Sequence, residues 1–526
     1  MSHLLARLYT SLRSEPPKSL SADGTRPRSA ILLVIAVVLT FFWQRTFEYA
    51  GSRLDLTYRT TVTAGLFGQD AFYYFYHYLG LFPVYAEGIA PIYSQSGAES
   101  ILRDHPEALR TERGYVIRSG DLGKVWLYGL DAWLKGEPRD VSAAEFTKWF
   151  FVLGLIGILV AMWYADQFLL GLLMVVFIGS HPFQLYEVYA DNVPGAGQVF
   201  SILISTALVG LAFHVPLIFD RRLPKWYLYV LPVLTGIFFG TVRQVRNEPT
   251  VLLLSVVACY ALVAGVNRRA KFAMILFVLL AFGIASQTWN YYWDAKIRQS
   301  YAVVTQHGGQ PYTGELTRTH IFWHPLWAGL GDFGQKYGYA WDDVAAYDYA
   351  TPILKREGAI DYAMIGTEKS TAWYDERQLY FKMIWTQPRY EEVLRDKVVG
   401  DILRDPAWYL EVLARRVWRI LTKVAPARVA VGANWITLPL SGILLIPTLL
   451  VLILLRRWTL VKLLGFVLPL AVTAFVIYSG SGFTYYSIYP QVLAAIYLTA
   501  LWGGLRWVLR RAGGLRGKYG TLSVKT

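Results

Sequence analysis

The chain has 526 residues, 55% of them hydrophobic and only 17% charged, and its mean hydropathy is positive. A soluble protein carries about 25% charged residues, so this composition excludes an ordinary soluble enzyme. The net charge of +14 comes from short basic clusters between apolar runs, which argues against a nucleic-acid partner. The single cysteine, Cys259, excludes an internal disulfide and a cysteine-based zinc cluster.

Recurrent apolar runs predict ten membrane spans. Each run has about 17–24 residues, which is enough to cross ~30 Å of hydrocarbon. The polar stretch 1–28 precedes the first span and predicts a disordered cytoplasmic tail. The second and third spans follow each other so closely that they predict a tight hairpin at Asp166. The predicted spans are 29–48, 148–165, 167–185, 196–218, 225–243, 249–266, 272–291, 436–456, 459–479 and 485–509.

Short basic loops predict the orientation of these spans. When the spans alternate, five clusters of Lys and Arg fall on one side of the membrane, within 7–28, 221–225, 268–271, 456–462 and 506–518. Short loops rich in Lys and Arg stay on the cytoplasmic side. We therefore expect a multi-pass protein of a bacterial inner membrane, with a cytoplasmic N-terminus and a cytoplasmic C-terminal tail at 510–526.

This orientation exports two large segments, 49–147 and 292–435. The first is an outer loop with interfacial helices and belongs to an N-terminal transmembrane module, 29–291. The second is predicted to form an extracytoplasmic domain of mixed structure, and 436–509 supplies the C-terminal transmembrane helices. The predicted fold class is therefore mainly α, a polytopic membrane helical bundle with a mixed extracytoplasmic domain.

Asp70 precedes the most aromatic stretch of the chain, 71–85. This stretch holds too many tyrosines, Tyr74 among them, for a simple span, and it favours a helix lying in the membrane interface. A carboxylate at the start of such a helix would meet a lipid-linked substrate at bilayer depth and act as a general base. The alternative is that Asp70 only stabilises the start of the helix.

A second pair of carboxylates, Glu187 and Asp191, lies in the short outer loop 187–197. Asp191 stands just before an Asn-Val-Pro-Gly sequence, so simple turn chemistry is one explanation. Because the loop is predicted on the same side as Asp70, the other explanation is catalytic. The two carboxylates would then orient an acceptor hydroxyl or amine, or hold a divalent cation through oxygen ligands.

Two arginines, Arg243 and Arg246, stand between apolar spans on the predicted outer side, where positive residues are rare. Charges close to the membrane are costly and indicate function by default. Arginine suits bidentate phosphate binding, so we expect Arg243, Arg246 and the neighbouring Glu248 to line a substrate site. The alternative is an internal ion pair between an arginine and Glu248.

The second large outer segment contains His320 and His324, four residues apart. This spacing is compatible with a metal pair on a helix, but no His-Glu-x-x-His pattern is present and Pro325 follows directly. We therefore assign no metal ligands and count His324 among the candidate substrate-binding residues. The glycine-rich stretch 329–336 lacks the features of a phosphate-binding loop and is expected to be a structural or substrate-gating loop.

Taken together, these stretches resemble the GT-C superfamily of membrane glycosyltransferases. The likeness is greatest to the bacterial branch that uses polyprenyl-phosphate sugars, related to protein mannosyltransferases and aminoarabinose transferases. The chain differs from that pattern in having no glutamate beside Asp70 and a tyrosine in place of an arginine near the last span. Four motifs carry the resemblance: Gly68-Gln69-Asp70-Ala71 with Tyr74, Arg243–Glu248, Asp405-Pro406 with Tyr409 and Arg415-Arg416, and Tyr485-Tyr486 before Pro490.

The resemblance implies an inverting transfer of a sugar from a polyprenyl-phosphate carrier to an extracytoplasmic acceptor, which is a glycan, a lipid or a protein. Asp70 would be the general base, and Arg243 and Arg246 would neutralise the departing phosphate. Tyr485 and Tyr486 would supply further hydrogen bonds, and the aromatic helix would cradle the prenyl chain in the membrane lipid. A divalent metal is an optional cofactor, because some members of the superfamily use one and the sequence does not demand it.

Two other functions compete with this hypothesis. A polyprenyl-linked polysaccharide ligase or polymerase would depend on His320 and His324 and would not need Asp70. A lipid or glycan transporter would show repeated halves and charges in the middle of its spans. The predicted spans are almost free of charge and the polar residues stand at one rim, which argues against transport.

Overall fold

The structure is a computed structural model, and the described part of the chain is mainly helical. The described ranges are 26–51, 69–86, 89, 94–111, 122–136, 143–181, 201–221, 224–311, 322–334, 336–341, 343–359, 388–423, 427–431, 434–438, 442–471 and 488–519.

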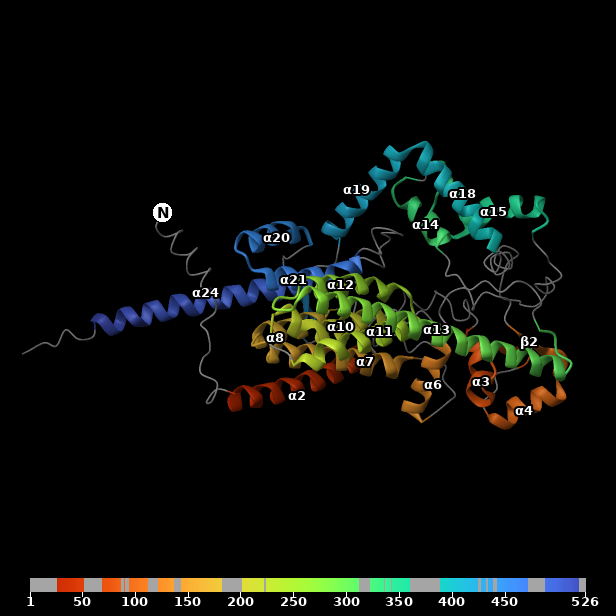
Figure 1. The fold of residues 1–526 in the computed structure, drawn as a ribbon, viewed down its shortest axis with the longest axis horizontal. Coiled ribbons are helices and arrows are strands. Elements are labelled where there is room, and N and C mark those ends of the chain that lie inside the picture. Colours follow the sequence, from red (N-terminus) through yellow and green to blue (C-terminus); the bar gives the residue numbers. More distant parts are fainter. Residues whose placement is uncertain are drawn as a thin grey trace, which may run out of the picture.

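An elongated helical bundle forms the centre of the molecule (Figure 1). Every predicted span overlaps a helix of this bundle. Its elements are α2 (Arg26–Gly51), α7 (Ala144–Tyr164), α8 (Phe168–Gly179), α10 (Ser201–Ile218), α11 (Lys225–Val242), η2 (Glu248–Val251), α12 (Leu252–Leu262), α13 (Arg268–Gln306), η5 (Gly442–Leu444), α20 (Leu445–Leu454), α21 (Trp458–Val467), η6 (Leu468–Ala471) and α24 (Tyr489–Tyr519).

Four of the described helices are long and apolar enough to cross a membrane: Glu145–Tyr164, Lys225–Val242, Arg268–Gln306 and Tyr489–Leu509. Six shorter apolar helices overlap the remaining predicted spans. The described chain therefore has four helices that could span a membrane, and the number of ten spans stays a prediction.

The bundle helices approach each other closely at glycines. Gly236 and Gly240 are four residues apart on α11 and face α13, where a Cβ added at Gly236 would lie 2.5 Å from the Val278 carbonyl oxygen. A Cβ added at Gly154 of α7 would likewise lie 2.9 Å from the Leu208 Cβ of α10. Small residues at such spacing let backbones meet where lipid gives no hydrophobic force between helices.

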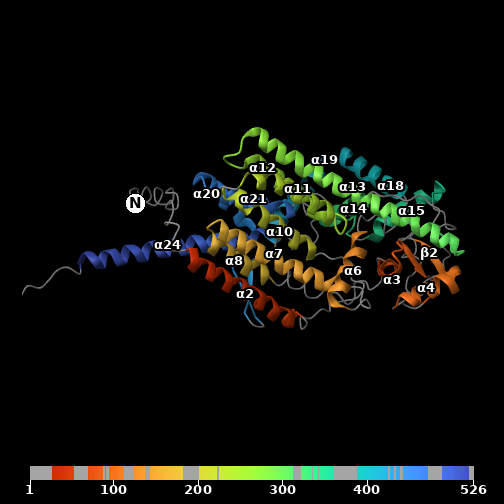
Figure 2. The ribbon, with the colours of Figure 1, turned by 60° about the horizontal axis from the view of Figure 1, so that its bottom comes forward.

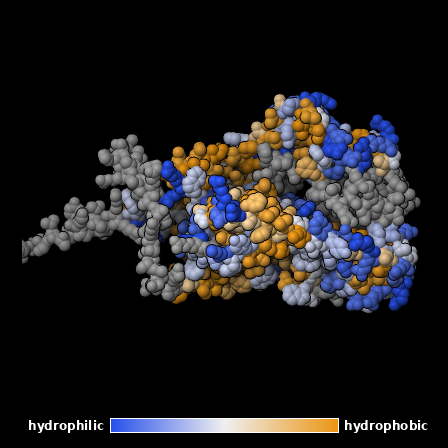
Figure 3. Space-filling view, in the orientation of Figure 1, coloured by the Kyte–Doolittle hydropathy of each residue, from blue (hydrophilic) through white to orange (hydrophobic). Residues whose placement is uncertain are grey.

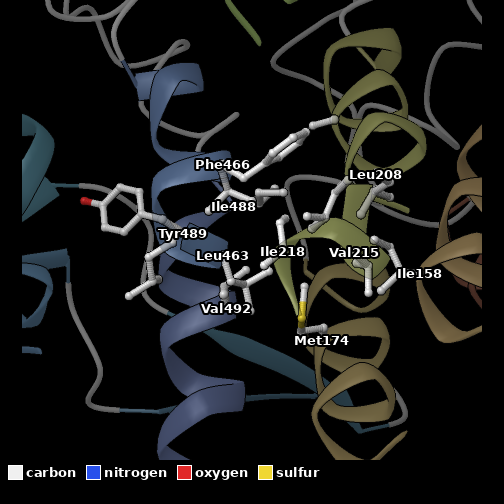
Figure 4. Close-up of a cluster of buried hydrophobic side chains, with 14 of the residues drawn as sticks. Ile158, Met174, Leu208, Val215, Ile218, Leu463, Phe466, Ile488, Tyr489 and Val492 are labelled. Carbon is white, nitrogen blue, oxygen red and sulfur yellow. The ribbon is translucent and has the colours of Figure 1, made fainter. Parts of the chain in front are cut away.

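The core of the bundle is one continuous apolar cluster (Figure 4). Phe466 of α21 and Tyr489 and Val492 of α24 pack toward Leu208 of α10 and Met174 of α8. These helices are far apart in the sequence, so the cluster joins the C-terminal helices to the N-terminal ones.

One end of the bundle, named the Asp220 end here, gathers several predicted basic loops. The Asp220 carboxylate lies 2.8 Å from the Lys462 ammonium and accepts a hydrogen bond from the Ala264 N–H at 3.3 Å. The predicted hairpin at Asp166 is confirmed: the residue has φ 56° between α7 and α8, and it pairs with Arg221 at 2.6 Å. Loops that were predicted to share one side therefore meet at one end.

The first outer segment lies at the opposite end of the molecule (Figure 2). The predicted aromatic helix 71–85 is shorter than expected, because α3 ends at Leu79 and residues 84–86 form a strand. This segment contains α3 (Gln69–Leu79), β1 (Val84–Ala86), α4 (Gln95–Asp104), η1 (Pro106–Ala108), β2 (Leu109–Thr111) and α6 (Gly123–Lys135), with β1 and β2 antiparallel.

The long helix α13 connects the bundle to this segment, as both ribbon views show. The predicted boundary between residues 291 and 292 falls inside α13, which runs unbroken to Gln306. Beyond the apolar part of the helix, the Ser300 hydroxyl accepts a hydrogen bond from the Phe82 N–H at 2.7 Å, and the hydroxyls of Tyr292 and Tyr76 are 3.0 Å apart. The helix thus holds the first outer segment directly.

The described part of the second outer segment is a helical unit with its own core. Among the described residues, the β-structure of this segment consists of the hairpin β3–β4 and a single bridge between Gln310 and Arg110. The strand β4 occupies the expected start of the span 436–456. The elements are α14 (Trp323–Leu330), η3 (Gly331–Phe333), η4 (Lys336–Gly338), α15 (Asp343–Arg356), α18 (Pro388–Arg404), α19 (Pro406–Lys423), β3 (Arg428–Val431) and β4 (Asn434–Thr437).

Candidate functional site

The structure brings together two of the predicted motifs, α3 and the loop 243–248. Tyr73 of α3 and Val245 of the loop are both buried, 0% and 3% exposed, and belong to one apolar cluster with Leu127 and Tyr128 of α6. We call this meeting point of α3, α6 and loop 243–248 the junction.

A backbone contact fixes α6 against the loop. The Gly123 N–H at the start of α6 donates a hydrogen bond to the Gln244 carbonyl oxygen at 2.8 Å. A Cβ added at Gly123 would lie 2.8 Å from the Gln244 backbone, so only glycine permits this approach. The loop therefore has a fixed position relative to the first outer segment.

Asp70 is the second residue of α3, one helical turn before Tyr74. Its side chain lies outside the described part of the structure. Tyr74 is half-buried beside the junction cluster, and its ring centroid lies 5.3 Å from that of Tyr73. The helix that carries Asp70 is thus anchored in the junction by its next turn.

Burial perturbs the titratable groups of this helix. It raises the pKa of the Tyr73 hydroxyl well above its usual range, and the charges of neighbouring tyrosines add to the effect. It also lowers the pKa of the His77 imidazole, which stacks on the Tyr73 ring at a centroid distance of 5.3 Å. Both groups are therefore neutral near pH 7.

The two arginines of the loop have different surroundings. Arg246 is 9% exposed and its guanidinium forms a two-pronged ion pair with Glu248, in which Nε donates to Oε2 at 3.1 Å. The internal ion pair that the sequence allowed as an alternative to phosphate contact is therefore formed. Arg243 is exposed, donates to the Asn247 side-chain oxygen at 3.3 Å, and lies 5.9 Å from the Phe282 ring centroid. Arg243 is the arginine that a substrate can reach.

His324 belongs to the core of the second outer segment. It is 3% exposed, its Nδ1 lies 2.6 Å from the Tyr390 hydroxyl, and its ring packs on Tyr347. The carboxylate of Glu391 accepts hydrogen bonds from its N–H and from those of the two preceding residues. In the described structure His324 is a core residue of the second segment, in a different cluster from the junction.

The remaining candidates, Asp191, Tyr485 and Tyr486, lie outside the described residues, as do Glu187 and His320. Among the side chains that the structure does describe, no group of three or more His, Cys, Asp and Glu is placed to hold a metal ion. The junction therefore rests on α3, α6 and the arginine loop.

Comparisons with known proteins add no relative. No family model, curated protein or solved structure matches the chain.

The glycine-rich stretch has a structural role, which is one of the two roles expected for it, but the sequence did not single out Asp332. Asp332 is 3% exposed as a side chain, and its carboxylate lies 3.1 Å from Arg419 and 3.6 Å from the fully buried Arg416. A Cβ added at Gly331 would lie 2.2 Å from the Ala340 carbonyl carbon, which explains the glycine. The stretch therefore connects α14 to α19 through Asp332. The spacing of residues in the sequence could not predict that Asp332 is buried between two arginines of α19.

Asp405 of the Asp-Pro motif is a structural residue. Its carboxylate accepts a hydrogen bond from the Trp408 N–H at 3.1 Å, as expected for the residue that caps a helix before proline. It also binds the Lys336 ammonium at 2.5 Å and the Tyr337 hydroxyl at 2.9 Å. The hydrogen bond from Lys336, with that from Trp408, lowers the pKa of the Asp405 carboxyl to about 2.

Proposed function

We propose that the protein is a GT-C-like integral membrane glycosyltransferase that moves a sugar from a polyprenyl-phosphate carrier to an extracytoplasmic acceptor with inversion. The observation that carries the proposal is the junction: the helix that begins with Asp70 and the loop that presents Arg243 share one buried cluster. A carboxylate and an exposed arginine on adjoining elements are the groups that such a transfer needs.

The chemistry follows from these two groups. The acceptor hydroxyl attacks the anomeric carbon of the donor, and its proton passes to Asp70. The bond between the anomeric carbon and the phosphate oxygen breaks, and the phosphate leaves on its lipid carrier. Arg243 stabilises the charge that grows on this phosphate, and the ion pair of Arg246 with Glu248 keeps the loop in place. Asp191, Tyr74, Tyr485 and Tyr486 remain candidates for orienting the acceptor and the donor.

The proposal includes a location. The four long apolar helices support insertion in a membrane, and the gathering of basic loops at the Asp220 end supports a cytoplasmic position for that end. The junction would then face outward from a bacterial inner membrane, with both termini in the cytoplasm and ten spans. A divalent metal stays optional.

Replacement of Asp70 by asparagine tests the base. In proteoliposomes that contain a labelled polyprenyl-phosphate sugar, Asp70→Asn is expected to lower transfer about 10²–10⁴-fold, the usual worth of a general base. Its thermal midpoint should stay close to that of the wild type. Asp104→Asn is the matched control, because Asp104 is an exposed acid of the same outer segment that pairs with Arg103.

The outcomes separate the proposal from its rivals. Full transfer by Asp70→Asn would remove Asp70 as the base, and equal losses in Asp70→Asn and Asp104→Asn would show a non-specific effect. The ligase or polymerase alternative requires an accessible His324, and the burial of His324 against Tyr390 gives that alternative no support.

A further inference from the structure

Helix α19 carries an exposed apolar stripe. Leu410, Val417 and Trp418 are 64%, 44% and 61% exposed, and the spacing of the set places it on one helix face. The stripe, named the α19 stripe, consists of Ala407, Leu410, Ala414, Val417 and Trp418.

The opposite face of α19 is already occupied. Val412, Arg416 and Ile420 are buried, and Val412 belongs to the core of the second outer segment. The helix therefore uses one face to hold its own domain and leaves a second apolar face outside. A contiguous apolar surface of this kind marks a contact with another molecule or with a membrane.

The α19 stripe continues into the apolar surface of the bundle. Just beyond the stripe, Leu421 is partly buried against the bundle core. Its carbonyl oxygen would lie 2.8 Å from a Cβ added at Gly442, and the Tyr489 hydroxyl of α24 donates to the Ile420 carbonyl at 2.9 Å. Directly after Gly442, exposed apolar side chains follow along η5 and α20: Ile443 41%, Ile446 50%, Leu450 57% and Leu454 72%. Figure 3 shows hydrophobic surface over α20 and along α19, whereas the far end of α15 is hydrophilic.

The composition and position of the stripe indicate which surface covers it. The helix contains four basic residues and one acidic residue. These charges do not form a free basic face, because Arg415 pairs with Glu411, Arg419 pairs with Asp332 and Arg416 is buried. An exposed helix face with Trp and Leu, next to the exposed apolar residues of α20, is typical of helices that lie in the membrane interface.

We propose that α19 is an interfacial helix, and that its stripe inserts into the bilayer surface beside α20. This contact would hold the domain of α14, α15 and α18 against the membrane rather than free in solution. Insertion of α19 requires the bundle to lie in a bilayer and is independent of sugar transfer, so either proposal can fail without the other.

Depth measurements on spin-labelled protein test this inference. Leu410→Cys, Ala414→Cys and Trp418→Cys are made singly in a Cys259→Ser background, labelled with a nitroxide, and placed in liposomes that contain anionic lipid. Ala414→Cys removes no large side chain, so it keeps the test valid if either other variant is unstable. Arg395→Cys is the water-exposed control on α18, and Leu450→Cys is the lipid-exposed control on α20.

The expected result is a nitroxide about 5–10 Å below the headgroups at the three stripe positions. Such labels are accessible to oxygen and shielded from a polar nickel complex, whereas the label at Arg395→Cys meets the nickel complex freely. Water-like accessibility at the stripe overturns the inference, and so does a water-like label at Leu450→Cys. Dipolar broadening between stripe labels at high lipid dilution would also overturn it, because a second copy of the chain would then cover the stripe.

Discussion

Replacement of Gly236 by alanine should loosen the contact between α11 and α13. The new Cβ would lie 2.5 Å from the Val278 carbonyl oxygen, 2.6 Å from the Ala281 Cβ and 2.7 Å from the Phe282 nitrogen. Ordinary contact begins at 3.4 Å, and 3.4 − 2.5 gives 0.9 Å as the movement required. Since two of the three atoms belong to the α13 backbone, a side-chain rotation cannot supply this movement. Overpacking of this kind costs about 1–3 kcal/mol.

Gly283→Ala is the matched control for this variant. Gly283 is also in a bundle helix, and a Cβ added there meets nothing within 4 Å. Alanine gains about 1 kcal/mol of helix propensity over glycine at either position, so the difference between the two variants isolates the steric cost. The free energy of unfolding is measured by titration with sodium dodecyl sulfate in mixed micelles. Equal stability of Gly236→Ala and Gly283→Ala would refute the close contact.

Two further predictions concern charged residues of the loop 243–248 and of the second large segment. Arg246→Gln and Glu248→Gln should each lower stability, and a double-mutant cycle should give a coupling of about 0.5–3 kcal/mol, because the variants remove the same ion pair; additive losses would contradict it. Asp405→Asn should lower the thermal midpoint relative to the wild type, and the difference should be constant from pH 5 to 8. The folded-state pKa of Asp405 is depressed from 3.8 to about 2, so the difference should shrink only as the pH falls below 3.8 toward 2. Scanning fluorimetry over a pH series measures this gap, and a gap that closes near pH 6 would assign the effect to another group.

Hydropathy located the helices of the bundle but not their ends. Every predicted span overlaps a helix, because a run of apolar residues is a local property of the sequence. The helix α13 passes the predicted boundary at 291 and ends only at Gln306, before Gly308 with φ 84°. Hydropathy records where the helix leaves an apolar environment, whereas the helix itself ends where a glycine breaks it. Hydropathy did not predict the hairpin β3–β4, because the apolar residues of β4 are continuous with the apolar run of the predicted span 436–456.

The site was predictable where its contacts are local. The ion pair of Arg246 with Glu248 joins residues two apart, so the sequence offered it as an alternative. The partners of His324 and Asp332 lie 66 and 87 residues further along the chain, in Tyr390 and Arg419, and spacing alone cannot find them. The proximity of α3 to the loop 243–248 was also only a hypothesis, because both were predicted to lie on the same side of the membrane. The burial of Tyr73 and Val245 in one cluster supports this hypothesis.

One pair of helices positions both halves of the junction. The loop 243–248 follows α11 directly, and α11 is held on α13 by Gly236 and Gly240. The same α13 continues beyond the bundle and contacts the α3–β1 segment through Tyr292 and Ser300. A displacement of α11 from α13 would therefore move the arginine loop relative to α3. If the junction is the catalytic centre, Gly236→Ala should lower sugar transfer by more than its loss of stability alone explains, whereas Gly283→Ala should leave transfer unchanged.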